Sequence, residues 1–288
     1  FPIPFDCDPE QVLYFDIETH SADEQWNLPA REFFRLGQYA WGPTGKVVLT
    51  EDYDEMLDVI RSAAGVVGHN IINFDLPALF GKDSMEPLHM AIEGKVYDTF
   101  IHANLAMPSP EGPYRLRNGQ RSLADSPPAI MKWLGLDNLA YQLGLSGKIA
   151  DLSDMAKKYG GFCHIPVDDP EFREYAEVDV MVSQQLSCAL LDVSPLDAYD
   201  AREQLTASID AQVSRNGFRV DIARAEARVK DLAERKAELL GRLEAEYDFP
   251  TTGKQPWRST AGKAAIMRIL ADNGITPGTR PSWTRTKT

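Results

Sequence analysis

The sequence predicts an α/β fold in which helices cover a mixed sheet. Residues 12–18 form a β-branched and aromatic run that ends in two carboxylates, which is typical of a buried strand. Residues 36–41 and 46–50 flank a Gly-Pro-Thr-Gly turn and predict a β-hairpin. Apolar residues at helical spacing in 55–64, followed by the apolar run 65–68, predict a helix and then a buried strand. Strands followed by alternating strands and helices favour a mixed sheet with helices on its faces.

The second half of the chain is predicted to be helical. Apolar periodicity places helices at 136–144, 151–159, 170–192, 222–247 and 259–273. Ser194-Pro195 precedes a further long helix that ends at Asn216-Gly217, where glycine provides a left-handed cap. Five prolines in residues 107–128 predict an extended surface loop. We therefore expect an α/β domain at 1–194 and an all-helical segment at 195–288.

Composition excludes several classes of protein. The 288 residues are 43% hydrophobic and 25% charged, which is typical of a globular protein with a sizeable core. No apolar run reaches the length of about 18 residues that a membrane helix needs, and the first residues lack the order of a signal peptide. The cysteines Cys7, Cys163 and Cys188 are odd in number and widely spaced, so we expect reduced structural thiols. These features predict a cytoplasmic protein without a membrane partner.

The net charge of −13 argues at first against a nucleic-acid partner, because phosphate binding needs basic groups. The charge is unevenly distributed, however. Residues 1–200 carry 14 Lys and Arg against 32 Asp and Glu, whereas residues 201–288 carry 16 against 11. An acidic half that holds metal ions and a basic end that holds phosphates is one interpretation. The alternative is an acidic domain with a basic tail.

Five residues in three segments are candidates for chemistry. Asp16 and Glu18 lie two apart at the end of a strand, so their side chains share a face, and neighbouring carboxylates call for a cation. Asp75 lies near the start of a helix, where the alternative is a capping or first-turn acid. Tyr175 and Asp179 share one face of a helix, where the alternative is a surface pair.

Taken together, D-x-E, N-x4-D and Y-x3-D resemble, in order and context, the three exonuclease motifs of the DEDD superfamily. They are most similar to the 3′–5′ proofreading domain of family A, DNA polymerase I-like DNA polymerases. Tyr175 indicates the tyrosine subtype, because the histidine subtype would have histidine where Glu174 stands. Asn70 precedes Asp75 by five residues, as in some phage-type polymerases. The resemblance implies a ribonuclease H-like sheet.

The resemblance continues beyond the nuclease motifs. Residues 215–221, Arg-Asn-Gly-Phe-Arg-Val-Asp, are similar to the segment that opens the polymerase region of family A enzymes. The helix at 222–247 would then begin the thumb. The palm motifs D-Y-S-Q-I-E-L-R and H-D-E do not occur in the sequence. We therefore expect a fragment of a longer bacteriophage-type polymerase, working in the host cytoplasm with the rest of that polymerase and without polymerising activity of its own.

The resemblance also implies a two-metal mechanism, since phosphodiester hydrolysis requires an activated water and a stabilised 3′ oxygen. The implied catalytic residues are Asp16, Glu18, Asp75, Tyr175 and Asp179. Asp16, Glu18 and Asp179 would hold the ion that activates water, Asp16 would bridge to a second ion near Asp75, and Tyr175 would orient the water. Because the metal ligands are carboxylates, we expect Mg²⁺, with Mn²⁺ able to substitute. We expect no site with sulfur or clustered histidine ligands.

The expected substrate is a DNA 3′ end, single-stranded or frayed. Candidates for gripping the terminal nucleotide are Thr19, His69, Asn70 and Phe74, with ordinary loop and core roles as the alternative. Asp98 and His20 lie near the motifs, but we expect neither to be catalytic. The alternatives for function are an exoribonuclease of the same superfamily, a non-catalytic domain that positions DNA, and an acidic interaction domain that bears these motifs by coincidence.

Overall fold

A computed structural model describes residues 4–25, 27–107, 114–115, 121–122, 132–145, 152–253 and 255–275. Most of the loop predicted at 107–128 lies outside these residues. The chain divides into two compact units, Phe1–Gly217 and Phe218–Thr288.

The first unit is built on a five-stranded mixed sheet of order β3-β2-β1-β4-β5. The strands are β1 (Val12–Thr19), β2 (Phe34–Trp41), β3 (Val48–Thr50), β4 (Gly65–Gly68) and β5 (Val96–Asp98). The central strand β1 is antiparallel to β2 and parallel to β4. The predicted α/β class, the hairpin and the strands at 12–18 and 65–68 are therefore confirmed.

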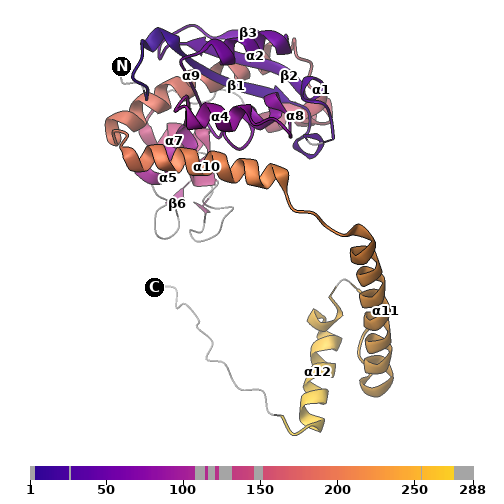
Figure 1. The fold of residues 1–288 in the computed structure, drawn as a ribbon. Coiled ribbons are helices and arrows are strands. Elements are labelled where there is room, and N and C mark those ends of the chain that lie inside the picture. Colours follow the sequence, from indigo (N-terminus) through magenta and orange to yellow (C-terminus); the bar gives the residue numbers. More distant parts are fainter. Residues whose placement is uncertain are drawn as a thin grey trace, which may run out of the picture. The chain divides into compact units, whose positions relative to one another are not determined.

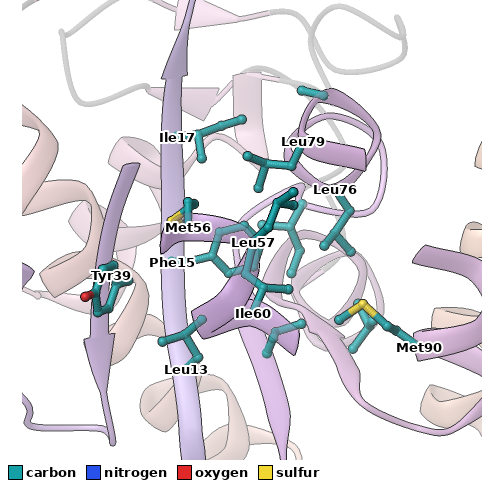
Figure 2. Close-up of a cluster of buried hydrophobic side chains, with 14 of the residues drawn as sticks. Leu13, Phe15, Ile17, Tyr39, Met56, Leu57, Ile60, Leu76, Leu79 and Met90 are labelled. Carbon is teal, nitrogen blue, oxygen red and sulfur yellow. The ribbon is translucent and has the colours of Figure 1, made fainter. Parts of the chain in front are cut away.

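Side chains of β1 alternate between two apolar layers, because successive residues of a strand point to opposite faces. Figure 2 shows Leu13, Phe15 and Ile17 packing with Leu57 and other buried residues of one layer. Leu57 belongs to α2 (Tyr53–Ser62), the helix that the sequence predicts at 55–64. Full burial of each such side chain contributes about 1.5–3 kcal/mol to stability. Burial of Leu13, Phe15 and Ile17 therefore determines the orientation of β1, with its other face turned to the opposite layer.

The opposite layer contains Val12 and Tyr14 of β1 together with Val180 of α9 (Pro170–Val193). This long helix begins at the N-cap Asp169, whose side chain accepts hydrogen bonds from the main-chain N–H groups of Glu171 and Phe172. Because Asp16 and Glu18 continue the alternation of Val12 and Tyr14, they point toward the α9 side of the sheet.

The remaining helices of the first unit surround the sheet (Figure 1). They are α1 (Ala30–Phe33), α3 (Asp75–Phe80), α4 (Glu86–Ile92), α5 (Thr99–Ala106), α7 (Leu136–Leu143), α8 (Leu152–Tyr159) and α10 (Ala198–Asn216). Short 3₁₀ turns are η1 (Pro9–Gln11), η2 (Ala22–Glu24) and η3 (Phe162–His164), and β6 (Tyr114–Arg115) pairs with β7 (Arg121–Ser122). Sequence periodicity predicts α7, α8, α9 and α10 within a few residues of their observed ends.

Helix α10 belongs to the first unit, although the sequence places a boundary near residue 194. Gln204 of α10 donates to the carbonyl oxygen of Asp98 and accepts from its N–H, both at 3.0 Å. These bonds join the helix to the end of β5. The contacts therefore divide the chain after Gly217, which has a φ of 61° at the end of α10.

The second unit consists of α11 (Ile222–Tyr247), η4 (Pro256–Arg258) and α12 (Thr260–Asp272). Helices α11 and α12 are in contact with each other (Figure 1). As predicted, α11 starts after Asp221, whose side chain accepts a hydrogen bond from the N–H of Arg224 at 3.0 Å. Within the described ranges, the chain has no helix whose length and apolar content would suffice to cross a membrane.

Candidate metal centre

Three carboxylates meet between the sheet and α9. Asp16 and Glu18 come from the end of β1 and Asp179 from the third turn of α9, and one oxygen of each lies within 4.8 Å of the others. Asp179 is buried, with 6% of its surface exposed, while the two strand carboxylates are half-buried. The segments that the sequence singled out are thus brought together, although they lie about 160 residues apart along the chain.

Asp75 lies against the same strand. It is the first residue of α3 and only 2% exposed, and its Oδ1 accepts a hydrogen bond from the N–H of Ile17 at 3.1 Å. Burial raises the pKa of Asp75 well above its usual range, and the nearby charge of Asp16 raises it further. Asp75 is therefore an acid in the first turn of α3, whose N-cap is Phe74, and it is both buried and electrostatically linked to Asp16.

Gln38 orients the first carboxylate. It lies opposite Asp16 in the register of β1 and β2, is fully buried, and donates from Nε2 to Asp16 Oδ2 at 2.6 Å. A neutral amide fixes the carboxylate without cancelling its charge. Gln38 was not predicted from the sequence. The one feature that could have indicated its role is a polar side chain at a position of the predicted hairpin that is expected to be buried.

Tyr175 is positioned as a hydrogen-bond donor facing the acids. Burial raises the pKa of its phenol, and the charges of Asp179, Glu18 and Asp16 raise it further, as does a side-chain hydrogen bond with Asp179. Tyr175 therefore stays protonated at neutral pH. It lies one helical turn before Asp179, which places both on one face of α9.

Asp98 holds the segment that leads into α3. This fully buried carboxylate accepts hydrogen bonds from the N–H groups of Asn70 at 2.7 Å, Ile72 at 3.0 Å and Phe100 at 2.9 Å. Asn70 has a φ of 64°, in the left-handed region that asparagine tolerates better than most residues. Asp98 is thus a structural organiser of the turn, and the expectation that it is not catalytic stays a prediction.

The candidate nucleotide-binding residues make contacts inside the protein. His69 Nδ1 lies 2.9 Å from the hydroxyl of Thr99, which itself donates to the carbonyl oxygen of Gly68, so His69 Nδ1 carries the proton. The imidazole meets the ring of Phe100 edge-on at 5.7 Å. A neutral His69 consequently has its acceptor nitrogen, Nε2, at the other end of the ring.

Thr19 and Phe74 lie on either side of that segment in sequence. The hydroxyl of Thr19 donates to the carbonyl oxygen of His20 at 2.9 Å, and Phe74 packs edge-on against Phe33 at 6.4 Å. Both contacts agree with ordinary loop and core roles. A part in nucleotide binding stays a prediction for Thr19, His69, Asn70 and Phe74.

The acidic cluster suits a hard divalent cation. All its ligand atoms are carboxylate oxygens, which Mg²⁺ and Mn²⁺ prefer to nitrogen or sulfur. Burial raises the pKa of Asp75 and the charge of Asp16 raises it further, so a cation bound nearby would favour the ionised form of these acids.

Stabilisation by Mg²⁺ is expected to increase with pH. Burial raises the pKa of Asp98 to about 6 and that of Asp75 well above its usual range. The folded chain therefore keeps protons that the unfolded chain releases above about pH 4, so these groups lower stability as pH rises through this window. Because a cation competes with protons, a fixed Mg²⁺ concentration of about 100 times the Kd at pH 8 should add about 2.7 kcal/mol at that pH and much less at pH 5, where the Kd is higher. Thermal unfolding with Mg²⁺ or chelator at both pH values measures this, and equal shifts would contradict it.

A second cluster combines sulfur, nitrogen and oxygen donors, although the sequence predicts no site with sulfur or clustered histidine ligands. His20, Glu24 and Cys163 each offer a ligand atom within 4.8 Å of the others, and all three side chains are half-buried. Sequence spacing could not reveal this cluster, because Cys163 lies far along the chain from His20 and Glu24 and the fold alone joins them.

Comparison of the chain with models of protein families gives no match, and comparison with curated proteins gives none either. The three converging carboxylates, with the buried Asp75 nearby, can hold a divalent cation, and the protonated Tyr175 presents a hydrogen-bond donor beside it.

Proposed function

We propose that the chain is a metal-dependent 3′–5′ exonuclease with a ribonuclease H-like fold that removes nucleotides from DNA 3′ ends. The observation that carries the proposal is the convergence of Asp16, Glu18 and Asp179 within 4.8 Å, with Asp75 and Tyr175 at the same place. A strand, a helix start and a long helix supply them, as in the motifs of the DEDD superfamily that the sequence resembles. The chain is in this proposal a fragment of a family A DNA polymerase.

The side chains have separate roles in this proposal. Asp16, Glu18, Asp75 and Asp179 hold divalent cations, with Gln38 fixing one oxygen of Asp16. When bound, such cations supply Lewis acidity, which activates water at neutral pH and stabilises the departing 3′ oxygen. Tyr175 keeps its proton because of the surrounding acids, so it can hold the attacking water by a hydrogen bond.

DNA is the proposed substrate because of the charge distribution and the thumb-like segment. Residues 251–288 carry 7 Lys and Arg against 1 Asp or Glu, a balance suited to phosphate contacts. The segment 215–221 resembles the opening of a DNA polymerase region, which favours DNA over RNA. The acids alone would serve either nucleic acid, because their chemistry is at the phosphate.

The direct test is a denaturing-gel time course with 5′-labelled single-stranded DNA and matched RNA. We expect a ladder that shortens from the 3′ end on DNA with Mg²⁺ or Mn²⁺ and not with a chelator. Preference for RNA would replace the proposal by an exoribonuclease. Cleavage of neither substrate under any metal would refute it and favour a domain that only positions DNA.

Replacing Tyr175 by phenylalanine is expected to slow hydrolysis about 10- to 100-fold, because a hydrogen bond to a charged or reacting group is worth about 1.5–3 kcal/mol. Stabilisation by Mg²⁺ should be retained, since the carboxylates are intact. Single-turnover rates on labelled DNA measure the effect. Tyr141→Phe is the matched control, because Tyr141 lies on α7 with 56% of its surface exposed. Equal rates for the two variants would show that the hydroxyl of Tyr175 has no role in hydrolysis.

A further inference from the structure

We propose that His20, Glu24 and Cys163 form a zinc site that is distinct from the acidic metal centre. Their ligand atoms, an imidazole nitrogen, a carboxylate oxygen and a thiol sulfur, all lie within 4.8 Å of one another. The inference does not depend on the proposed nuclease activity, since it follows from the chemistry of these three side chains alone.

The first two ligands are held by backbone hydrogen bonds at the end of β1. The N–H of His20 donates to the carbonyl oxygen of Phe33 at 2.9 Å, and its own carbonyl oxygen accepts from the hydroxyl of Thr19 at 2.9 Å. The N–H of Glu24 donates to the carbonyl oxygen of Ser21 at 2.7 Å, which closes the η2 turn. This turn returns Glu24 toward His20, so both side chains are placed before any ion binds.

The third ligand is held by Arg35 of β2. The guanidinium of Arg35 donates to the carbonyl oxygens of Phe162, at 3.1 Å, and of Ile165, which flank Cys163 on either side of η3. It also lies 5.5 Å from the centre of the Phe172 ring, a cation–π distance. Arg35 therefore anchors the turn that carries Cys163 against the sheet independently of any metal.

Arg35 also lies close to both clusters. Burial lowers the pKa of Arg35, while the nearby Cys163 and Glu18 raise it. Arg35 thus lies between the two clusters, close to a member of each.

The ligand types select the metal. Zn²⁺ accepts sulfur, nitrogen and oxygen donors together at about 2.0–2.3 Å, whereas Mg²⁺ requires oxygen donors throughout. Three half-buried side chains can close on an ion from their present separation and leave a fourth position for water. The acidic cluster, with carboxylates only, takes the harder ion. A zinc ion would tie the segment that follows β1 to the η3 turn that precedes α9.

The test is a titration of the full chain with Co²⁺, a spectroscopic substitute for Zn²⁺, in excess Mg²⁺ to occupy the acidic cluster. The wild-type chain is expected to bind one equivalent with a thiolate-to-cobalt charge-transfer band in the near ultraviolet, which Zn²⁺ abolishes by displacement. Cys163→Ser should lose the band and weaken Zn²⁺ binding by about 100-fold or more, because loss of a group behind a ligand already costs about 10–100-fold. His20→Ala should weaken binding similarly.

Two controls separate this site from the others. Cys188→Ser removes a half-buried cysteine of α9 that lies outside the cluster and should leave the band unchanged. Asp179→Asn alters the acidic centre. It should also leave the charge-transfer band unchanged, whatever its effect on the hydrolysis of nucleic acids. Circular dichroism confirms that each variant is folded. No charge-transfer band with the wild-type chain, or a band that survives Cys163→Ser, would overturn the proposal.

Discussion

Hydrolysis of DNA 3′ ends is expected to fall at least about 1000-fold when Asp16 and Glu18 are both replaced by alanine. Metal ions contribute several kcal/mol of transition-state stabilisation, and each 1.4 kcal/mol corresponds to a factor of ten in rate. The double variant removes two of the three carboxylates that converge within 4.8 Å, so the cation loses most of its ligands. Stabilisation by Mg²⁺ should disappear together with activity.

The fold of this double variant is expected to survive. Replacing Asp16 leaves the buried side-chain amide of Gln38 without its acceptor, which costs about 1–3 kcal/mol. It also removes the charge that raises the pKa of Asp75, so repulsion among the acids decreases. Thermal unfolding in chelator should therefore give a Tm within a few degrees of wild type.

A matched control for this pair is Asp58→Ala, which removes an exposed carboxylate on α2 that is not a member of the acidic cluster. It should leave both rate and Mg²⁺-dependent stabilisation unchanged. Retention of normal turnover by the double variant would refute the assignment of the metal centre. Loss of activity accompanied by unfolding would instead call for the isosteric pair Asp16→Asn and Glu18→Gln.

The sequence predicts the strand and the helix that carry this centre, because their apolar side chains recur with the period of a β-strand or of an α-helix. The β-branched and aromatic residues of 12–18 fit a strand that is buried on both faces, and 170–192 keeps helical spacing over six turns. Residues two apart in a strand point to the same face, so Asp16 and Glu18 lie on one face of β1. Their convergence with Asp179 agrees with this.

Features that depend on pairing between distant segments were not predictable in this way. Gln38 meets Asp16 only through the register of β1 and β2, and Cys163 meets His20 only after the sheet and η3 are in place. The attachment of α10 depends on two hydrogen bonds between Gln204 and the backbone of Asp98, 106 residues earlier. Periodicity carries no information on such contacts, so the sequence alone placed the boundary before α10.

Asp98→Ala is expected to lower the stability of the first unit by about 3–5 kcal/mol. The substitution leaves the buried N–H groups of Asn70, Ile72 and Phe100 without their acceptor, and each such group costs about 1–3 kcal/mol. It also removes the N-cap of α5, whose loss costs about 0.5–2 kcal/mol and overlaps with the Phe100 contribution. Partial relaxation and entry of water keep the total below the sum of these costs.

The isosteric variant Asp98→Asn distinguishes lost hydrogen bonds from lost volume. In the native chain Oδ1 accepts from Asn70 and Phe100 while Oδ2 accepts from Ile72. Asparagine can keep the first pair, but its amide then places a donor against the N–H of Ile72, so a loss of about 1–3 kcal/mol is expected. Denaturant unfolding measures both variants, with the exposed loop residue Asp83→Ala as the control. A chain that tolerates Asp98→Ala as well as Asp83→Ala would show that the turn before α3 keeps its shape without this carboxylate, and the placement of Asp75 against β1 would then need another cause.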